Sequence, residues 1–471
     1  MLFSSIPFVF LFLPLSLVGY FLCAKFLAPS GKLVWLALAS LGFYAYWRVD
    51  HLPILLGSIV VNFAIASAIQ IQVERFGSRP KLAYFLLFIG VAFNLGLLGF
   101  FKYFDFLIET TNETIGSQIS TFDLVLPLAI SFFTFQQIAY LVDSYKGATV
   151  RGSLLNYFVF VTFFPQLIAG PIVHHREMMP QFMRKSLGVF RWKNLLIGLT
   201  IFSLGLFKKI VLADQFALHA DLGYADFQNM SVIDAWLTTL SYTFQLYFDF
   251  SGYSDMAIGA AQMFGIVLPL NFFSPYKATS IQQFWRRWHM TLSRFLKEFV
   301  YVPLGENRRS ETRVNLNLFT TFVLGGIWHG AGWTFILWGA IHGIALVIGR
   351  AFGKLGIALP RTLNWLMTFL TVHIAWVFFR SENFPQAISI LKTLFGVGVP
   401  DGPSNIVIME NETASLYLLA AFVIVLAMPN TSEFTRDVRS KPKVIFAALL
   451  FGVACTTMLA SSSEVFLYYN F

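Results

Sequence analysis

Long apolar segments dominate this sequence and decide which folds are open to it. Stretches such as 5–24, 52–71 and 82–104 carry almost no charge, and a helix needs about 20 apolar residues to cross a bilayer. Lipid admits only helices and closed barrels, and barrels show short alternating strands rather than long unbroken runs. Only 12% of the residues are charged, against about 25% in a typical soluble domain. The sequence therefore predicts an all-α polytopic membrane protein and excludes an ordinary soluble enzyme.

The apolar runs locate the expected passages. Uninterrupted spans are predicted at 5–24, 33–48, 52–71, 82–104, 122–142, 194–213, 315–328, 333–349, 362–380, 413–428 and 444–462. The run 154–173 contains Pro165, Gly170 and Pro171, which interrupt helices, so we interpret it as re-entrant. We expect 232–270 to be a passage broken around Asp249 and Asp255. Irregular backbone at membrane depth survives only inside protein or along a cavity, so these breaks indicate a central cavity.

The charges predict the orientation of the chain. Its net charge of +9 would suggest a nucleic-acid partner in a soluble protein, but here basic residues more simply mark cytoplasmic loops. The basic loop 72–81 places the N-terminus outside, and the loops 105–121 and 214–231, which lack Lys and Arg, also fall outside. The segment 271–313 carries eight Lys or Arg against three Glu and is expected to be cytoplasmic.

A first candidate for chemistry is the segment 279–300. Its apolar residues recur at steps of three and four, and Arg286 and Arg287 fall on the opposite face. This pattern predicts one helix lying in the membrane interface, with Trp285 on its apolar face. His289 lies at the border of that face and is directed inward. Periodicity alone favours a structural histidine bonded to backbone over a functional one.

A second candidate is the glycine- and tryptophan-rich segment 325–343, within a predicted hairpin whose two ends are cytoplasmic. It holds His329, and an ionisable residue at membrane depth is expensive and often functional. Trp328 and Trp333 would supply rigid walls, and the glycines would allow close approach of a substrate. A neutral imidazole there could act as general base toward a hydroxyl. A structural role explains these residues equally well: His329 would be a core histidine, and the glycines would serve helix packing. His342 and His373 are expected to be structural.

Polar residues near the expected break in 232–270 raise a further alternative, that the protein is a transporter. Asp249 and Tyr276 could line a hydrophilic pocket, although satisfying loosened backbone groups is the more economical role. Broken helices and intramembrane acids also occur in transporters, but the duplicated halves common in transporters are not found in this sequence.

Several long motifs resemble one known family. The runs LYFDFSGYSDMAIGAAQMFG (246–265), NFFSPYKATSIQQFWRRWHMTLSRFLKEFVYVPLGENR (271–308) and GGIWHGAGWTFILWGAIHG (325–343) are similar to the membrane-bound O-acyltransferase family. The similarity is to the branch of the alginate O-acetylation membrane subunit, and more distantly to the teichoic acid D-alanyl transfer protein. Further family-like runs lie at 43–50, 99–106, 126–147 and 163–174, so the resemblance covers most of 1–380.

The resemblance implies a fold and a site. It implies one membrane domain over 1–471, with about 10–12 transmembrane or re-entrant helices around a tunnel and interfacial helices on the cytoplasmic side. Within it we distinguish N-terminal spans (1–150), a re-entrant segment with a basic loop (154–193), a catalytic core (232–349) and C-terminal spans (362–462). His329 would be the catalytic base, and His289 would orient substrate or assist. The expected substrate-binding residues are Trp328, Trp333, Trp285, Tyr276, Asp249, Arg286 and Arg287.

It also implies substrates and partners. No cofactor or metal is expected to be bound; the donor would be a cytoplasmic thioester, acetyl-CoA or an acyl carrier protein. The acetyl group would pass across the bacterial inner membrane toward hydroxyls of a cell-envelope or exported polysaccharide. A periplasmic serine hydrolase-like partner is expected to complete the transfer, and no nucleic acid is expected. D-alanyl or other acyl transfer from a carrier protein remains an alternative.

Overall fold

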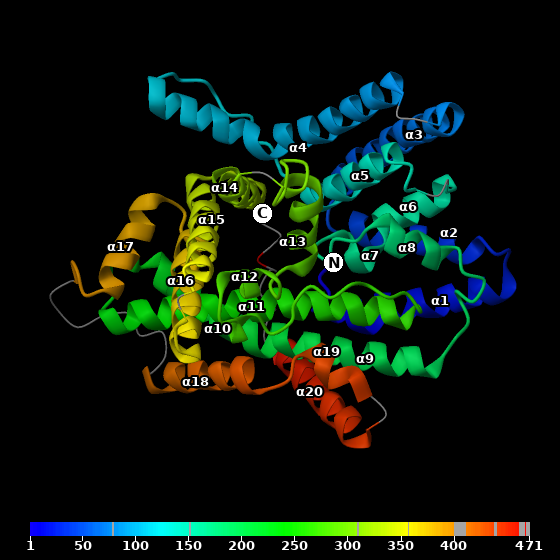
Figure 1. Cartoon of the computed structure of the whole chain (residues 1–471). Helices are drawn as coiled ribbons and strands as arrows, with labels where there is room; N and C mark the ends of the chain where they lie inside the picture. The colour runs from blue at the N-terminus through cyan, green and yellow to red at the C-terminus, as the bar shows by residue number, and fades with distance from the viewer. Residues whose placement is uncertain are drawn as a thin grey trace. The chain divides into compact units, whose positions relative to one another are not determined.

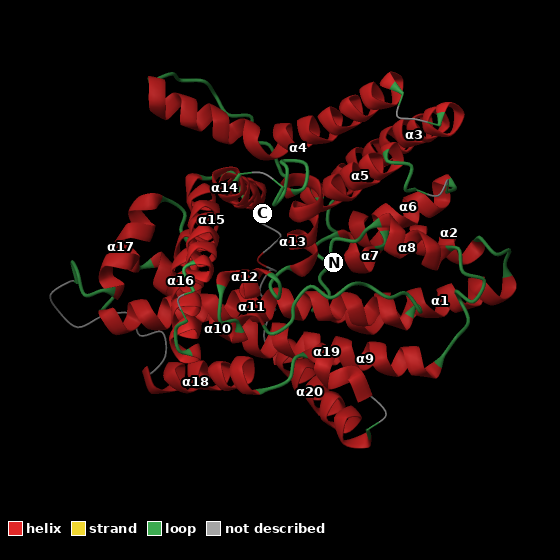
Figure 2. Cartoon of the chain, in the orientation of Figure 1, coloured by secondary structure: helices red, strands yellow, loops and turns green. Residues whose placement is uncertain are grey.

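The computed structural model describes residues 1–77, 80–149, 152–308, 310–356, 358–399, 411–437, 440–460 and 467. In these ranges the secondary structure is helical and contains no strand (Figure 2), which confirms the predicted all-α class. Seven helices are long and apolar enough to cross a membrane, and a bent pair at 413–437 raises the number to eight. The chain is a polytopic membrane protein. The loop predicted at 72–81 lies partly outside the described residues.

The chain forms two compact units, the first made of 1–202 and 256–269. The helices of this first unit, labelled in Figure 1, are η1 (Phe8–Phe12), α1 (Leu13–Phe26), α2 (Gly31–Ala45), η2 (Val49–His51), α3 (Leu52–Phe76), α4 (Lys81–Ile115), α5 (Ile130–Tyr145), α6 (Leu154–Thr162), α7 (Phe164–Leu167), α8 (His175–Phe182) and most of α9 (Trp192–Phe207). Two predicted boundaries are wrong here. The fourth span continues as helix to Ile115, and the fifth begins only at Ile130.

The interruption predicted in 154–173 is confirmed. Helix α6 ends at Thr162, α7 is a single short turn, and 168–174 is not helical. Residues 159–175 are all buried, so this irregular backbone is surrounded by protein.

Polar side chains inside the first unit pair with one another across helices. The amides of Asn62 (α3) and Asn94 (α4) exchange two hydrogen bonds of 3.2 and 2.6 Å. Gln137 (α5) donates to Ser58 and accepts from Tyr157 (α6). Each pair satisfies hydrogen-bond donors and acceptors that lipid could not satisfy, so these apolar spans can contain buried amide side chains.

The second unit comprises 203–255 and 270–471. Its helices are the end of α9, η3 (Lys208–Ala213), α10 (Asp214–Ala225), η4 (Phe227–Asn229), α11 (Val232–Met263, shared with the first unit), η5 (Pro275–Lys277), α12 (Ile281–Trp285), α13 (Met290–Leu296), η6 (Lys297–Tyr301), α14 (Glu311–His329), α15 (Trp333–Lys354), α16 (Arg361–Arg380), α17 (Phe384–Leu394), α18 (Asn411–Ala427), α19 (Thr431–Phe434), η7 (Thr435–Asp437) and α20 (Lys441–Ala460). Helix α10 continues the preceding helix, so the loop predicted at 214–231 is mostly helical, contrary to expectation.

The passage predicted to break at Asp249–Asp255 is instead one continuous helix, α11. Its acids are neutralised by two lysines of η3, a π-helical turn. Lys209 lies 2.6 Å from Asp214 and 2.9 Å from Asp249, and Lys208 lies 2.6 Å from Asp255. Gly252 is used for packing, because a Cβ there would come within 2.8 Å of the Gly205 carbonyl oxygen. Of the observations that favoured a transporter, the break in this passage is therefore not found.

The segment 279–300 is not the single helix that its periodicity predicts. Helix α12 ends at Trp285, α13 begins at Met290, and between them His289 adopts a left-handed conformation (φ +41°). The predicted apolar face is nevertheless correct, since Phe284, Trp288 and Leu292 are buried while Arg286 and Lys297 are exposed.

Candidate active site

His329 is the last residue of α14, the first helix of a tight hairpin with α15. The connection consists of three residues, and the extended backbone of Gly330 and Gly332 lets α15 start at Trp333. The imidazole is 3% exposed. The hairpin thus carries a buried histidine at its turn.

Glycines set the close approach of the two hairpin helices, which run side by side (Figure 1). A Cβ on Gly326 would collide with the Phe335 carbonyl oxygen, and one on Gly339 with the Phe322 carbonyl oxygen. The glycines therefore serve helix packing, and this packing fixes the position of His329.

Aromatic rings surround the His329 imidazole. The ring centroids of Trp328, Trp338 and Phe379 lie 4.8, 4.9 and 5.2 Å from it, all with edge-to-face geometry. Trp328 and Phe379 come from α14 and α16, and Trp338 from α15. Walls of this kind restrict the rotation of the imidazole.

His289 is the second buried imidazole, with no exposed surface. Its Nδ1 lies 3.0 Å from Oδ1 of Asn271, and its ring stands edge-to-face on Phe250 at 4.8 Å. Burial lowers the pKa of His289 to about 3, so this imidazole is neutral at physiological pH. The partner is a side chain, not the backbone group that the structural interpretation predicted.

The two histidines contact the same indole. The Trp328 ring centroid lies 4.8 Å from that of His329 and 6.3 Å from that of His289. The structure therefore brings together three residues that the sequence singled out in segments 40 residues apart.

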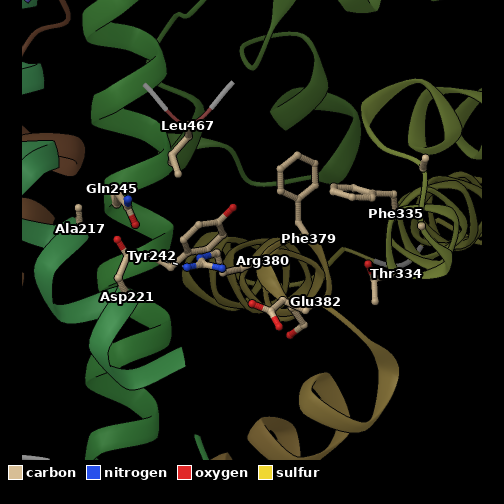
Figure 3. Close-up of a pocket in the computed structure, with 13 residues that line it drawn as sticks. Ala217, Asp221, Tyr242, Gln245, Thr334, Phe335, Phe379, Arg380, Glu382 and Leu467 are labelled. Carbon is tan, nitrogen blue, oxygen red and sulfur yellow. Dashed lines mark hydrogen bonds and ion pairs between the residues drawn. The ribbon is translucent and has the colours of Figure 1, made fainter. Parts of the chain in front are cut away.

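A cavity of about 400 Å³ lies next to this cluster (Figure 3). Phe379 lines this cavity and also contacts the His329 ring, so the cavity and the imidazole share one aromatic neighbour. Its lining combines apolar residues, among them Phe335 and Leu467, with these polar ones: Asp221, Tyr242, Gln245, Thr334, Arg380, Ser381 and Glu382. Arg380 is ion-paired to Asp221 at 2.8 Å. The cavity can accommodate a hydroxyl-bearing group.

The other predicted site residues occupy varied environments. Trp285 donates to Nδ1 of His342 at 3.3 Å, and Tyr276 donates to the Thr243 carbonyl at 2.8 Å, so both are engaged in the core. Trp333 is 50% exposed. Arg286 is exposed, and Arg287 reaches the Ser274 carbonyl at 3.5 Å. Their roles toward a substrate remain predictions.

The histidines expected to be structural have environments that fit this role. His342 lies among Trp285, Trp338 and Phe284. His373 lies within 3.2 Å of Thr239 and 2.9 Å of Thr243 and stacks on Trp236.

Sequence reasoning missed two groups near the site. The first is the pair Lys208 and Lys209, whose occurrence in an apolar run was a usable signal of buried partners. Lys209 engages Asp249, which we expected to contact substrate. The second is Phe379, which the sequence does not distinguish from the other aromatic residues of its span, such as Trp376 and Phe378.

Comparisons with known proteins agree with these motifs. The model of the MBOAT, membrane-bound O-acyltransferase family, matches residues 149–380. A peptidoglycan O-acetyltransferase of Helicobacter pylori is 44% identical over all of this chain and 98% of its own length. A probable alginate O-acetylase AlgI of Pseudomonas putida is 37% identical over the full length of both chains. A teichoic acid D-alanyltransferase of Streptococcus thermophilus is 29% identical over 48% of this chain and 57% of its own. The similarity thus extends beyond residue 380, where the motifs end.

Proposed function

Because this chain belongs to the membrane-bound O-acyltransferase family, we propose that it transfers an acetyl group from a cytoplasmic thioester to hydroxyls of a cell-envelope polysaccharide. The observation that carries the proposal is His329, buried in an aromatic enclosure at the turn of a glycine-packed hairpin and in contact with Phe379, which also lines a cavity.

The chemistry follows from a neutral imidazole. His329 accepts the proton of the acceptor hydroxyl as its oxygen attacks the thioester carbonyl carbon. The carbon–sulfur bond then breaks, and the thiolate takes the proton from the imidazolium, so no net proton is released. The close aromatic walls exclude water, which would otherwise hydrolyse the thioester.

The donor approaches from the cytoplasmic side. The segment 271–313, with eight Lys or Arg against three Glu, suits the phosphates of CoA or an acidic carrier protein. The acceptor side corresponds to the cavity beside Phe379. Identity to the peptidoglycan O-acetyltransferase is 44%, against 37% to the alginate O-acetylase that also matches over its full length, and this difference favours peptidoglycan over alginate as the acceptor polymer.

The protein lies in the inner membrane with its N-terminus outside, as the loop charges indicate. The acceptor hydroxyl in this step belongs to a periplasmic serine hydrolase-like protein, which then passes the acetyl group to the sugar.

The direct experiment compares cells that produce the wild-type chain with cells that produce His329→Ala. Mass spectrometry of muropeptides and exported glycans should show acetyl groups for the wild type and none for the variant, at equal protein levels in the membrane. His373→Gln, at a buried histidine outside the site, is the matched control and should retain acetylation. Acetylation by His329→Ala would refute the assignment.

A second measurement identifies the donor. Membranes supplied with radiolabelled acetyl-CoA should transfer label to the glycan, whereas an aminoacyl carrier protein should not. Transfer from the carrier alone would establish the D-alanyl alternative, which the similarity to teichoic acid D-alanyltransferases keeps open.

A further inference from the structure

Asn271 makes an unusual number of contacts with the segment around His289. Its Oδ1 lies 3.0 Å from Nδ1 of His289, 2.9 Å from Oγ1 of Thr291 and 3.4 Å from the Thr291 backbone nitrogen. Its Nδ2 donates to Ser254 at 3.3 Å. Its backbone carbonyl accepts from the amide of Met290 at 2.9 Å. Asn271 thus holds His289 through both backbone and side chain.

These contacts determine which way the Asn271 amide is oriented. The backbone N–H of Thr291 can only donate, so the atom facing it must be the oxygen. The same oxygen faces Nδ1 of His289, and an oxygen of a neutral amide can only accept. The imidazole must therefore carry its proton on Nδ1. Its Nε2 is then left as an acceptor.

The Nε2 atom is buried and has no hydrogen-bond partner among the described residues. The His289 backbone is also left-handed, a conformation that residues with a side chain rarely adopt. Strained backbone and unsatisfied buried groups occur together at functional sites. Here the left-handed backbone and the unsatisfied nitrogen both belong to His289, whose ring contacts Trp328, the residue before His329.

We propose that Asn271 is a positioning residue that fixes the tautomer of His289, so that Nε2 is presented as a hydrogen-bond acceptor to an N–H or O–H group of the reacting substrate. The inference rests on the proposed acetyl transfer. Without Asn271, the proton can occupy either nitrogen and the imidazole can rotate, so that the acceptor atom is no longer fixed.

The test is a double-mutant cycle on the full-length protein in membranes, with initial rates of acetyl transfer as the readout. Asn271→Leu keeps the backbone hydrogen bond to Met290 but cannot accept from Nδ1. We expect its kcat to fall by about 100-fold with a smaller change in KM, because an acceptor atom that is no longer fixed mainly weakens an interaction that the transition state requires. In a His289→Ala background, the same substitution should cause no further loss.

Two more variants separate positioning from folding. Asn271→Asp keeps an oxygen beside Nδ1 and should recover activity relative to Asn271→Leu. Thr291→Val removes a hydroxyl bonded to the same oxygen but leaves the Nδ1 contact, and it should be nearly as active as the wild type. If Asn271→Leu does not reach the membrane, Asn271→Ala replaces it in the cycle.

The outcomes are distinct. Losses that multiply in the double variant, or equal activity of the Asp and Leu variants, would overturn the role of Asn271. Acetylation by His329→Ala would instead overturn the proposed function itself, whatever the cycle gives.

Discussion

At the scale of single residues, burial of the two histidines and of Lys209 has the clearest energetic consequences. Each side chain has lost almost all contact with solvent, and His289 and Lys209 each depend on one or two specific partners. Groups of this kind make stability sensitive to pH and to the loss of a partner.

His289 should make the protein less stable in acid. Its pKa is lowered to about 3 by burial, against 6.5 for an unperturbed histidine, so it is neutral in both states above about pH 6.5. Between pH 6.5 and 3 the unfolded chain binds a proton that the folded protein does not. The free energy of unfolding therefore falls as pH falls, by about 1.4 kcal/mol per pH unit from this group. Thermal unfolding of the wild type and His289→Gln from pH 7 to 4 should show the steeper decline in the wild type; parallel curves would contradict this.

Lys209 should be required for stability. It is 3% exposed and pairs with both Asp214 and Asp249. Lys209→Met leaves two buried carboxylates without their cation, which we expect to cost about 3 kcal/mol or more. The unfolding temperature in detergent should drop markedly. Lys354→Met, which breaks the solvent-exposed pair with Glu311, is the control and should change it little. Equal effects of the two substitutions would show that burial of the ion pairs is unimportant.

At the scale of helices, packing between α14 and α15 supports the candidate site. Gly339→Ala places a methyl group against the Phe322 carbonyl oxygen, so the hairpin must separate and His329 must move. We expect a loss of about 1–3 kcal/mol in stability and reduced acetyl transfer. In the same helix, Gly349→Ala meets no atom within 4 Å and should preserve both properties. Wild-type activity and unfolding temperature in Gly339→Ala would contradict the role of this contact.

The spans could be predicted from sequence because crossing a membrane requires nearly every residue of a run to be apolar. The breaks could not be predicted equally well, because they depend on distant partners. Helix α11 stays continuous since Lys208 and Lys209, more than 35 residues earlier in the chain, neutralise its acids. The turn at His289 is invisible to periodicity because α12 and α13 keep the same buried face on either side of it. Asn271 holds that turn from 18 residues away.

Only part of the candidate site could be predicted from the sequence, because some of its residues lie in segments that carry no motif. His329, His289 and Trp328 carry strong local motifs, and the structure places them in contact. Phe379 comes from α16, whose sequence looks like an ordinary span, and only the tertiary fold brings it to His329.

At the scale of the whole molecule, the distribution of charge predicts its orientation in the membrane. In a chain whose Cys23 and Cys455 are replaced by serine, Gln228→Cys should react with a membrane-impermeant maleimide on cells with a permeabilised outer membrane. Glu298→Cys, within the basic segment 271–313, should react only after lysis. Both residues are exposed, so the difference reports sidedness. Labelling of both from one side would contradict the predicted topology.

The π-helical turn at Lys208–Ala213 has a consequence for how this protein can evolve. A π-helical turn closes i→i+5 hydrogen bonds and holds about one residue more than an α-helical turn, so deleting one residue here would change the spacing between the lysines and Asp214. Lys208 and Lys209 would then no longer share their acids among Asp255, Asp249 and Asp214 as they do now. Substitutions in this turn are open to compensation elsewhere, but insertions and deletions are not. We therefore expect selection to keep the number of residues between the two lysines and Asp214 constant.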